Sequence, residues 1–198
     1  MTAPTRIVLV RHALPADGGL VLPIAEVGLG ETGHEQARLL APRVAAVRPT
    51  ALYSSPRPRA VQTARPIADL IGIEPEIVAD LRELDFGELE GMPLAEIERH
   101  YPELAGWTSA PSSAVFPGGE SLPSMRDRAV GATQAIALAH PGGTAVVVCH
   151  GVVIRAVLAE MLQMPLDAIF RLEIPYCGVS EIDWFGDRPL VRSINGSL

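Results

Sequence analysis

The sequence predicts a single α/β domain over residues 1–198, built as a three-layer α/β/α sandwich with a mostly parallel central sheet. The runs at 7–10 and 144–149 are continuously apolar and rich in β-branched residues, as is typical of strands buried on both faces. Segments with helical spacing of apolar residues alternate with the strands, which favours parallel pairing through helical crossovers. A length of 198 residues with 48% hydrophobic content fits one domain with a real core.

The first half of the chain is expected to alternate between short strands and helices. After the first strand we expect a helix over 32–47, with Thr32 as its N-cap and Glu35 completing a capping box. Pro66 predicts a kink in the following helix. The other elements expected here are a strand at 51–53, that second helix at 58–71 and a short third strand at 76–79.

The second half adds a less regular segment and two late strands. Residues 92–120 are rich in proline and glycine and carry Tyr101, Trp107 and Phe116, so we expect a lid or insertion that covers the site. Ser121 is expected to cap the next helix. The remaining elements are that helix to about 140, a helix from 150 to about 162, and late strands at 177–184 and 190–194, expected to be antiparallel and near an edge.

Composition excludes several function classes. All 16 basic residues are arginine, so Schiff-base and phosphate-loop lysine chemistries are absent. The net charge of −7 argues against a dedicated nucleic-acid binder, and no apolar run approaches the roughly 18 residues needed to span a membrane. The N-terminal apolar run is too short for a signal peptide, and Cys149 and Cys177 are too few for a disulfide framework. We therefore expect a cytoplasmic protein that binds neither nucleic acid nor membrane.

Polar residues follow three of the expected strands at the point where each ends. Arg11-His12 follows the first strand, Ser54-Ser55 the second, and His150-Gly151 the strand at 144–149. Because ligands gather at the carboxyl ends of strands in such sheets, these residues are expected to meet on one rim.

The residues on this rim indicate an anion site. A single strand-end histidine is usually satisfied by a backbone carbonyl, but two in equivalent positions beside Arg11 are harder to explain that way. A metal would need a third ligand, and none of the other three histidines has suggestive spacing. Guanidinium groups of Arg11 and Arg59 match phosphate oxygens, imidazolium adds further donors, and a histidine nitrogen can attack phosphorus. A carboxylic acid would supply the leaving-group proton, and Glu83 is the candidate, with a solvated acidic loop as the competing interpretation.

Several blocks of the sequence resemble the histidine phosphatase superfamily, also called phosphoglycerate mutase-like. The resemblance runs in family order over most of the chain to about residue 160. The blocks are Leu9-Val10-Arg11-His12, residues 29–37, residues 53–64, Leu81 to Gly87 with Glu90-Gly91, Pro117 to Ser121, and Val148-Cys149-His150-Gly151.

The resemblance implies a role for each candidate residue. His12 would be the nucleophile that becomes phosphohistidine; Arg11, Arg59 and His150 would bind the phosphoryl oxygens; and Glu83 would protonate the leaving group and then activate water. No metal or organic cofactor would be required.

The first motif departs from the family pattern. The chain has Ala13-Leu14-Pro15, and Gly18 where an Asn would align, so it lacks the Thr hydroxyl and Asn amide that usually line the phosphate pocket. Either other donors replace them, such as backbone N–H groups around Gly18-Gly19, or phosphate binding is weaker. Cys149 beside His150 is interpreted as a buried thiol rather than a nucleophile.

The leading functional hypothesis is a metal-independent phosphomonoesterase acting on a small phosphorylated metabolite. The alternatives are a phosphoglycerate mutase-type phosphotransferase, a phosphoprotein phosphatase, and a phosphate-binding regulatory module without turnover. The short, apolar segment 13–28 favours hydrolysis over mutase activity, whereas the missing Thr and Asn motivate the non-catalytic module. Members of the family are often dimers, so a homodimer stays open.

Overall fold

A computed structural model describes residues 3–19, 22–186 and 188–196. Its six strands form one sheet in the order β3-β2-β4-β1-β5-β6. β1, β2, β3 and β4 pair in parallel, whereas β5 pairs antiparallel with both β1 and the edge strand β6. The strands are β1 Thr5–Arg11, β2 Ala51–Ser54, β3 Glu76–Ile77, β4 Thr144–Cys149, β5 Val179–Phe185 and β6 Arg188–Ser193. The mostly parallel sheet and the late antiparallel strands confirm the prediction.

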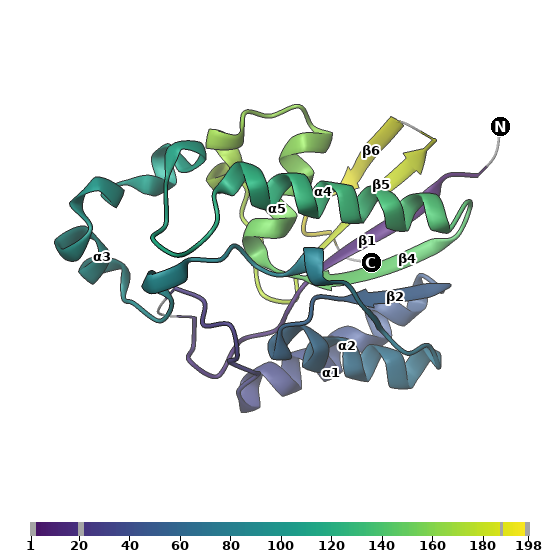
Figure 1. Cartoon of the computed structure of the whole chain (residues 1–198). Helices are drawn as coiled ribbons and strands as arrows, with labels where there is room; N and C mark the ends of the chain where they lie inside the picture. The colour runs from purple at the N-terminus through teal and green to yellow at the C-terminus, as the bar shows by residue number, and fades with distance from the viewer. Residues whose placement is uncertain (1–2, 20–21, 187, 197–198) are drawn as a thin grey trace.

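Helices cover both faces of the sheet and complete the predicted three layers (Figure 1). α1 and α2 lie on one face, and α4 and α5 lie on the other. The α-helices are α1 Glu31–Ala46, α2 Pro58–Ile71, α3 Leu94–His100, α4 Leu122–Ala139 and α5 Gly151–Met161. The 3-10 helices are η1 Ala79–Leu81, η2 Gly87–Leu89, η3 Pro102–Leu104, η4 Trp107–Ser109, η5 Pro111–Ser113 and η6 Leu166–Arg171.

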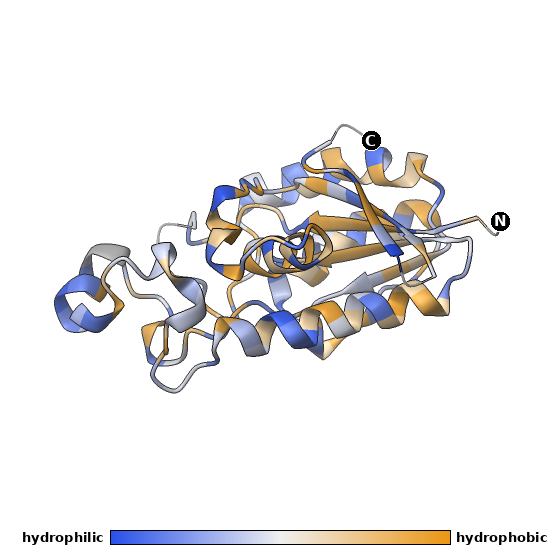
Figure 2. Cartoon of the chain, turned by 90° about the horizontal axis from the view of Figure 1, so that it is seen from above, coloured by the Kyte–Doolittle hydropathy of each residue, from blue (hydrophilic) through white to orange (hydrophobic). Residues whose placement is uncertain are grey.

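The central strands are apolar on both faces because each face is covered by helices. In β1, Ile7 and Leu9 belong to the hydrophobic cluster shared with α4 and α5, whereas Val8 and Val10 belong to the cluster shared with α1 and α2. Figure 2 shows these strands as an apolar interior between helices whose outer faces are more hydrophilic. The continuous apolar runs of the sequence therefore mark the middle of the sandwich.

The structure confirms one predicted helix cap and contradicts another. Ser121 caps α4 as predicted, since its Oγ accepts a hydrogen bond from the Ser124 N–H at 3.3 Å. The predicted cap at Thr32 is wrong. α1 begins one residue earlier, and Gly30 is its N-cap, with its carbonyl accepting from the His34 N–H at 2.9 Å. α2 runs without interruption through Pro66.

Residues 92–120 lie beyond the end of the sheet at which β1, β2 and β4 terminate (Figure 1). They contain α3 and the 3-10 helices η3, η4 and η5 rather than extended loop. Among the described residues, no helix combines the length and the apolar character that crossing a membrane requires.

Candidate active site

The two histidines predicted on the rim lie side by side because their strands are neighbours. In the register between β1 and β4, Arg11 pairs with Cys149, and the His12 N–H donates to the Cys149 carbonyl at 2.9 Å. His12 and His150 each follow their strand by one residue, and their ring centroids are 5.1 Å apart. The third strand end joins them, since the Ser55 N–H donates to the Val148 carbonyl at 2.9 Å.

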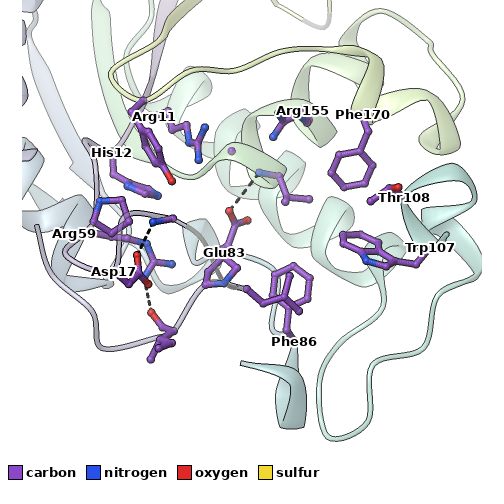
Figure 3. Close-up of a pocket in the computed structure, with 18 residues that line it drawn as sticks. Arg11, His12, Asp17, Arg59, Glu83, Phe86, Trp107, Thr108, Arg155 and Phe170 are labelled. Atoms are coloured by element: carbon purple, nitrogen blue, oxygen red, sulfur yellow. Dashed lines mark hydrogen bonds between the residues drawn. The ribbon is translucent and has the colours of Figure 1, made fainter. Parts of the chain in front are cut away.

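A cavity of about 260 Å³ opens at these strand ends. Arg11, His12, Arg59 and Glu83 line it, and His150 lies fully buried against His12. Figure 3 shows the Glu83 carboxylate between His12 and Arg59 on one side and the aromatic wall of the cavity on the other. All five residues singled out from the sequence thus come together, although they are spread over 139 positions of chain (from 11 to 150).

His12 presents one unprotonated ring nitrogen to the cavity. Its Nδ1 lies 2.7 Å from the Ala13 carbonyl oxygen, which can only accept, so Nδ1 carries the proton and Nε2 keeps its lone pair. Burial, Arg59 and Arg11 together lower the pKa of His12 to about 3, because each disfavours a second positive charge. The ring is therefore neutral at physiological pH.

His150 is fixed by a serine. Its Nε2 lies 2.6 Å from the Ser55 Oγ, and that hydroxyl also accepts from the Arg57 N–H at 3.3 Å. No other acceptor for the Ser55 proton occurs within the described part of the chain, so the hydroxyl donates to Nε2 and the His150 proton sits on Nδ1. Nδ1 is buried and meets no protein partner among the described residues. Burial and the adjacent His12 lower the pKa of His150, so it too is neutral here rather than the expected imidazolium.

Arg11 and Arg59 are each held by a backbone carbonyl and keep donors for a ligand. Arg11 Nη1 donates to the Ile174 carbonyl at 2.6 Å and its guanidinium stacks 3.8 Å from the centre of the Tyr176 ring, while its buried Nε has no partner among the described groups. Arg59, which is only 2% exposed, donates through Nη1 to the Ile24 carbonyl at 2.7 Å. Neither forms an ion pair within the described residues, so a bound anion would be their charge partner.

Glu83 is a buried side chain rather than part of a solvated acidic loop. It is 5% exposed, and its carboxylate accepts from the Leu84 N–H at 2.9 Å and the Val152 N–H at 3.3 Å. Arg128 holds the surrounding segment by donating to the carbonyls of Asp80, Arg82 and Glu83. No sequence signal indicated this role of Arg128, which lies 45 residues away on α4.

The loop after His12 does not supply the replacement donors considered at Gly18 and Gly19. The Gly18 N–H bonds to the Pro15 carbonyl at 3.0 Å, and the Gly19 N–H bonds to the Asp17 carboxylate at 2.9 Å. Both N–H groups form hydrogen bonds inside the loop, so neither replaces the donors of the missing Thr and Asn.

The aromatic segment contributes one of its aromatic side chains to the cavity. Trp107 lines it, together with Thr108, whereas Phe116 is buried behind Trp107 with ring centroids 5.3 Å apart. Tyr101 packs against the core instead. Of the three aromatic residues of this segment, Trp107 therefore lines the cavity, whereas Tyr101 and Phe116 serve packing.

Tyr176 and Arg155 are among the cavity-lining residues that the sequence reasoning missed. Arg155 could have been found, since it lies four residues after Gly151 in the helix that begins at the rim, and positions i and i+4 share a helix face. Cys149, by contrast, is fully buried, and burial raises the pKa of its thiol, as expected for an inert core cysteine.

Comparison with known proteins identifies the class to which this fold and site belong. The sequence profile of the histidine phosphatase superfamily (branch 1) matches residues 7–197, so the chain belongs to this superfamily. Phosphoserine phosphatase 1 of Hydrogenobacter thermophilus is 31% identical, over 96% of this chain and 92% of its own. The metal-independent phosphoserine phosphatase of Arabidopsis thaliana is 37% identical, over 80% of this chain and 69% of its own.

The fold agrees with solved structures of the same class. The mycobacterial glucosyl-3-phosphoglycerate phosphatase in complex with VO3 superposes with a TM-score of 0.87 at 23% identity, over 97% of this chain and 99% of that one. Family membership and the phosphatase relatives above 30% identity make the protein a phosphatase, that is, a phosphoric monoester hydrolase.

Proposed function

We propose that the protein hydrolyses a small phosphorylated metabolite without a metal ion, through a phosphohistidine formed on His12. The observation that carries the proposal is the His12 ring: Nδ1 is bound to the Ala13 carbonyl, and Nε2 keeps a free lone pair in a cavity with two guanidinium groups. This is the protonation state a histidine nucleophile needs, and the low pKa maintains it.

In the first step, His12 Nε2 forms a bond to phosphorus as the bond from phosphorus to the alcohol oxygen breaks. The carboxylic acid of Glu83 transfers its proton to that oxygen, and the alcohol leaves. The phosphorylated ring retains its Nδ1 proton, so the hydrogen bond to Ala13 stabilises the charge that develops on the ring. In the second step, water gives a proton to the Glu83 carboxylate and attacks phosphorus, the P–N bond breaks, and phosphate and neutral His12 are restored.

Charge stabilisation is assigned to three groups around His12. Arg11 and Arg59 supply guanidinium donors to the phosphoryl oxygens, and His150 donates through Nδ1. A neutral imidazole donor suffices for this role, since the two arginines already carry the positive charge.

The substrate is proposed to be a small phosphomonoester, with phosphoserine as the first to be tested because relatives of this chain carry the name phosphoserine phosphatase. The cavity, about 260 Å³ in volume, suits a small phosphoester. We further propose that residues 92–120 act as a lid on the single domain, through Trp107 and Thr108.

The test is turnover of p-nitrophenyl phosphate and phosphoserine by the purified protein in EDTA, with acid quenching to trap a phosphorylated, acid-labile intermediate. His12→Ala should abolish turnover and labelling while leaving the circular dichroism spectrum unchanged. His34→Ala removes an exposed histidine from α1 and serves as the matched control. Turnover that disappears in EDTA, or labelling that survives in His12→Ala, would contradict the proposal.

The same assays decide between this function and its alternatives. A mutase would need a bisphosphorylated primer and would move phosphate between hydroxyl groups without releasing it. A regulatory module would bind phosphate but release none from any ester.

A further inference from the structure

The cavity extends past Glu83 to a third arginine, Arg155 on α5. Figure 3 shows Arg155 beside Phe170, on the far side of the Glu83 carboxylate from His12 and Arg59. Trp107 and Thr108 complete this end of the cavity. It therefore has one cationic group set among aromatic walls.

One nitrogen of the Arg155 guanidinium is hydrogen-bonded to the protein, and the other two are not. Its Nε donates to the Leu172 carbonyl at 2.7 Å, which fixes the plane of the guanidinium. Within the described residues its two terminal nitrogens have no acceptor, and Arg155 forms no ion pair. Arg128 shows the contrast, because its guanidinium is used by three carbonyls and Glu120.

The electrostatic surroundings of Arg155 favour an anion. Burial and the nearby Arg11 lower the pKa of its guanidinium, whereas the carboxylates of Glu83 and Glu173 act in the opposite direction without forming an ion pair with it among the described residues. A Cβ on Gly151 would lie 3.0 Å from Arg155 Nη1 and 3.2 Å from Arg11 Nε, so the two cationic groups flank the same glycine. Only the lack of a side chain at Gly151 leaves this space open.

The direction of the proposed reaction decides which part of the substrate faces Arg155. An in-line displacement places the leaving oxygen opposite the attacking His12 Nε2, next to the acid that protonates it, Glu83. The alcohol portion then extends from Glu83 into the part of the cavity that Arg155 and Phe170 line. Arg155 therefore faces the organic part of the substrate.

We propose that Arg155 binds a carboxylate on the alcohol portion of the substrate, which makes the substrates phosphomonoesters of small hydroxy acids. This inference rests on the proposed function of the same site. The planar fork of a guanidinium matches the two oxygens of a carboxylate, and the cavity has room for a three-carbon acid. Arg155 is thus a residue that determines specificity.

The experiment uses pairs of esters that differ in the carboxylate. O-phosphoserine is paired with O-phosphoethanolamine, and 3-phosphoglycerate with glycerol 3-phosphate. The wild-type protein should turn over the carboxylate-bearing member of each pair with at least about tenfold higher kcat/KM. Arg155→Gln should lower kcat/KM for those members by about 10- to 100-fold and change the other members and p-nitrophenyl phosphate by less than about threefold.

Two controls guard the interpretation. Arg171→Gln removes an exposed arginine from η6 and should change none of these ratios. Arg155→Lys keeps the positive charge but loses the planar pair of N–H donors, so it should recover only part of the preference for carboxylate-bearing esters.

The outcomes separate this inference from the proposed function. Equal losses on both members of a pair would assign Arg155 to the phosphoryl group and overturn the inference while hydrolysis stands. The inference would also be overturned if the wild-type protein preferred the esters without a carboxylate, or preferred a bisphosphate to the phosphoester of a hydroxy acid. If no ester is turned over, the proposed function fails, and protection against thermal unfolding by phosphoserine relative to phosphoethanolamine still decides the role of Arg155.

Discussion

Removing the Ser55 hydroxyl tests how His150 is held. In Ser55→Ala the His150 Nε2 loses its partner at 2.6 Å, and the ring is fully buried, so water has no ready access to replace that partner. An unsatisfied buried polar atom costs about 1–3 kcal/mol, and a shift of the proton from Nδ1 to Nε2 would not relieve it, because the Nε2–H would then lack an acceptor. His150 would lose the contact that fixes its ring, which weakens the phosphoryl site.

The expected effect is a fall in kcat/KM of about 10- to 100-fold, corresponding to about 1.4–2.7 kcal/mol. Inhibition by inorganic phosphate should weaken in parallel, because the same Nδ1 donor would bind the product. The assay is steady-state hydrolysis of p-nitrophenyl phosphate with phosphate as a competitive inhibitor, together with urea denaturation to measure stability.

Ser54→Ala is the matched control. Ser54 is also fully buried and its hydroxyl donates to the Ser55 carbonyl at 2.9 Å, whereas the His150 ring is hydrogen-bonded to Ser55. It should lower stability with little effect on catalysis. If the two variants lose activity equally, or if Ser55→Ala keeps its activity and its inhibition by phosphate, the serine does not set the His150 proton.

Three other predictions concern the nucleophile, the acid and the loop that carries it. Glu83→Gln should slow the hydrolysis of alkyl esters far more than that of p-nitrophenyl phosphate, because only a poor leaving group needs a proton; equal losses would remove Glu83 from the acid role. The folded-state pKa of His12 is about 3 against an ordinary value of 6.5. As pH falls from about 6.5 towards 3, the unfolded chain therefore gains a proton that the folded protein does not, and stability should fall by up to about 1.4 kcal/mol per pH unit from this residue. Urea titrations of wild type and His12→Asn should show the smaller slope in the variant, and identical slopes would contradict the assignment. Gly87→Ala should reduce the free energy of unfolding by about 1–3 kcal/mol more than Gly72→Ala, as measured by the same titration; both glycines have positive φ, but only at Gly87 would the Cβ meet backbone, 2.2 Å from the Pro117 carbonyl oxygen, and equal losses would show that the contact is relieved at no cost.

Local sequence signals predicted the scaffold well because they report local physics. Apolar runs with β-branched residues placed β1 and β4, and Ser121 capped α4 as its residue type suggested. The prediction of a cap at Thr32 failed because α1 begins at Glu31, after Gly30, and no side-chain cap hydrogen bond forms at this end of the helix. Residue type indicates which groups can cap a helix but does not choose among neighbouring starts.

The sequence could place candidate residues at strand ends, but only their order along the chain was available, so Arg155 and Arg128 passed unnoticed. Their roles depend on what they face. One donates to a single carbonyl and keeps free donors in a cavity, whereas the other is saturated by Glu120 and the backbone of residues 80–83. Two arginines of identical chemistry thus differ in a property that exists only after folding.

The sequence by itself determined the layered fold, the strand ends that carry His12 and His150, and the reaction class that those side chains suit. Tertiary structure decided their protonation, because burial and neighbouring guanidinium groups shift the proton affinity of both imidazoles. It also decided that the glycines after His12 are not donors, and that a third arginine shares the cavity. The physical reason is that hydrogen-bond pairing and desolvation depend on contacts between distant segments. Apolar periodicity, by contrast, depends only on the order of consecutive residues.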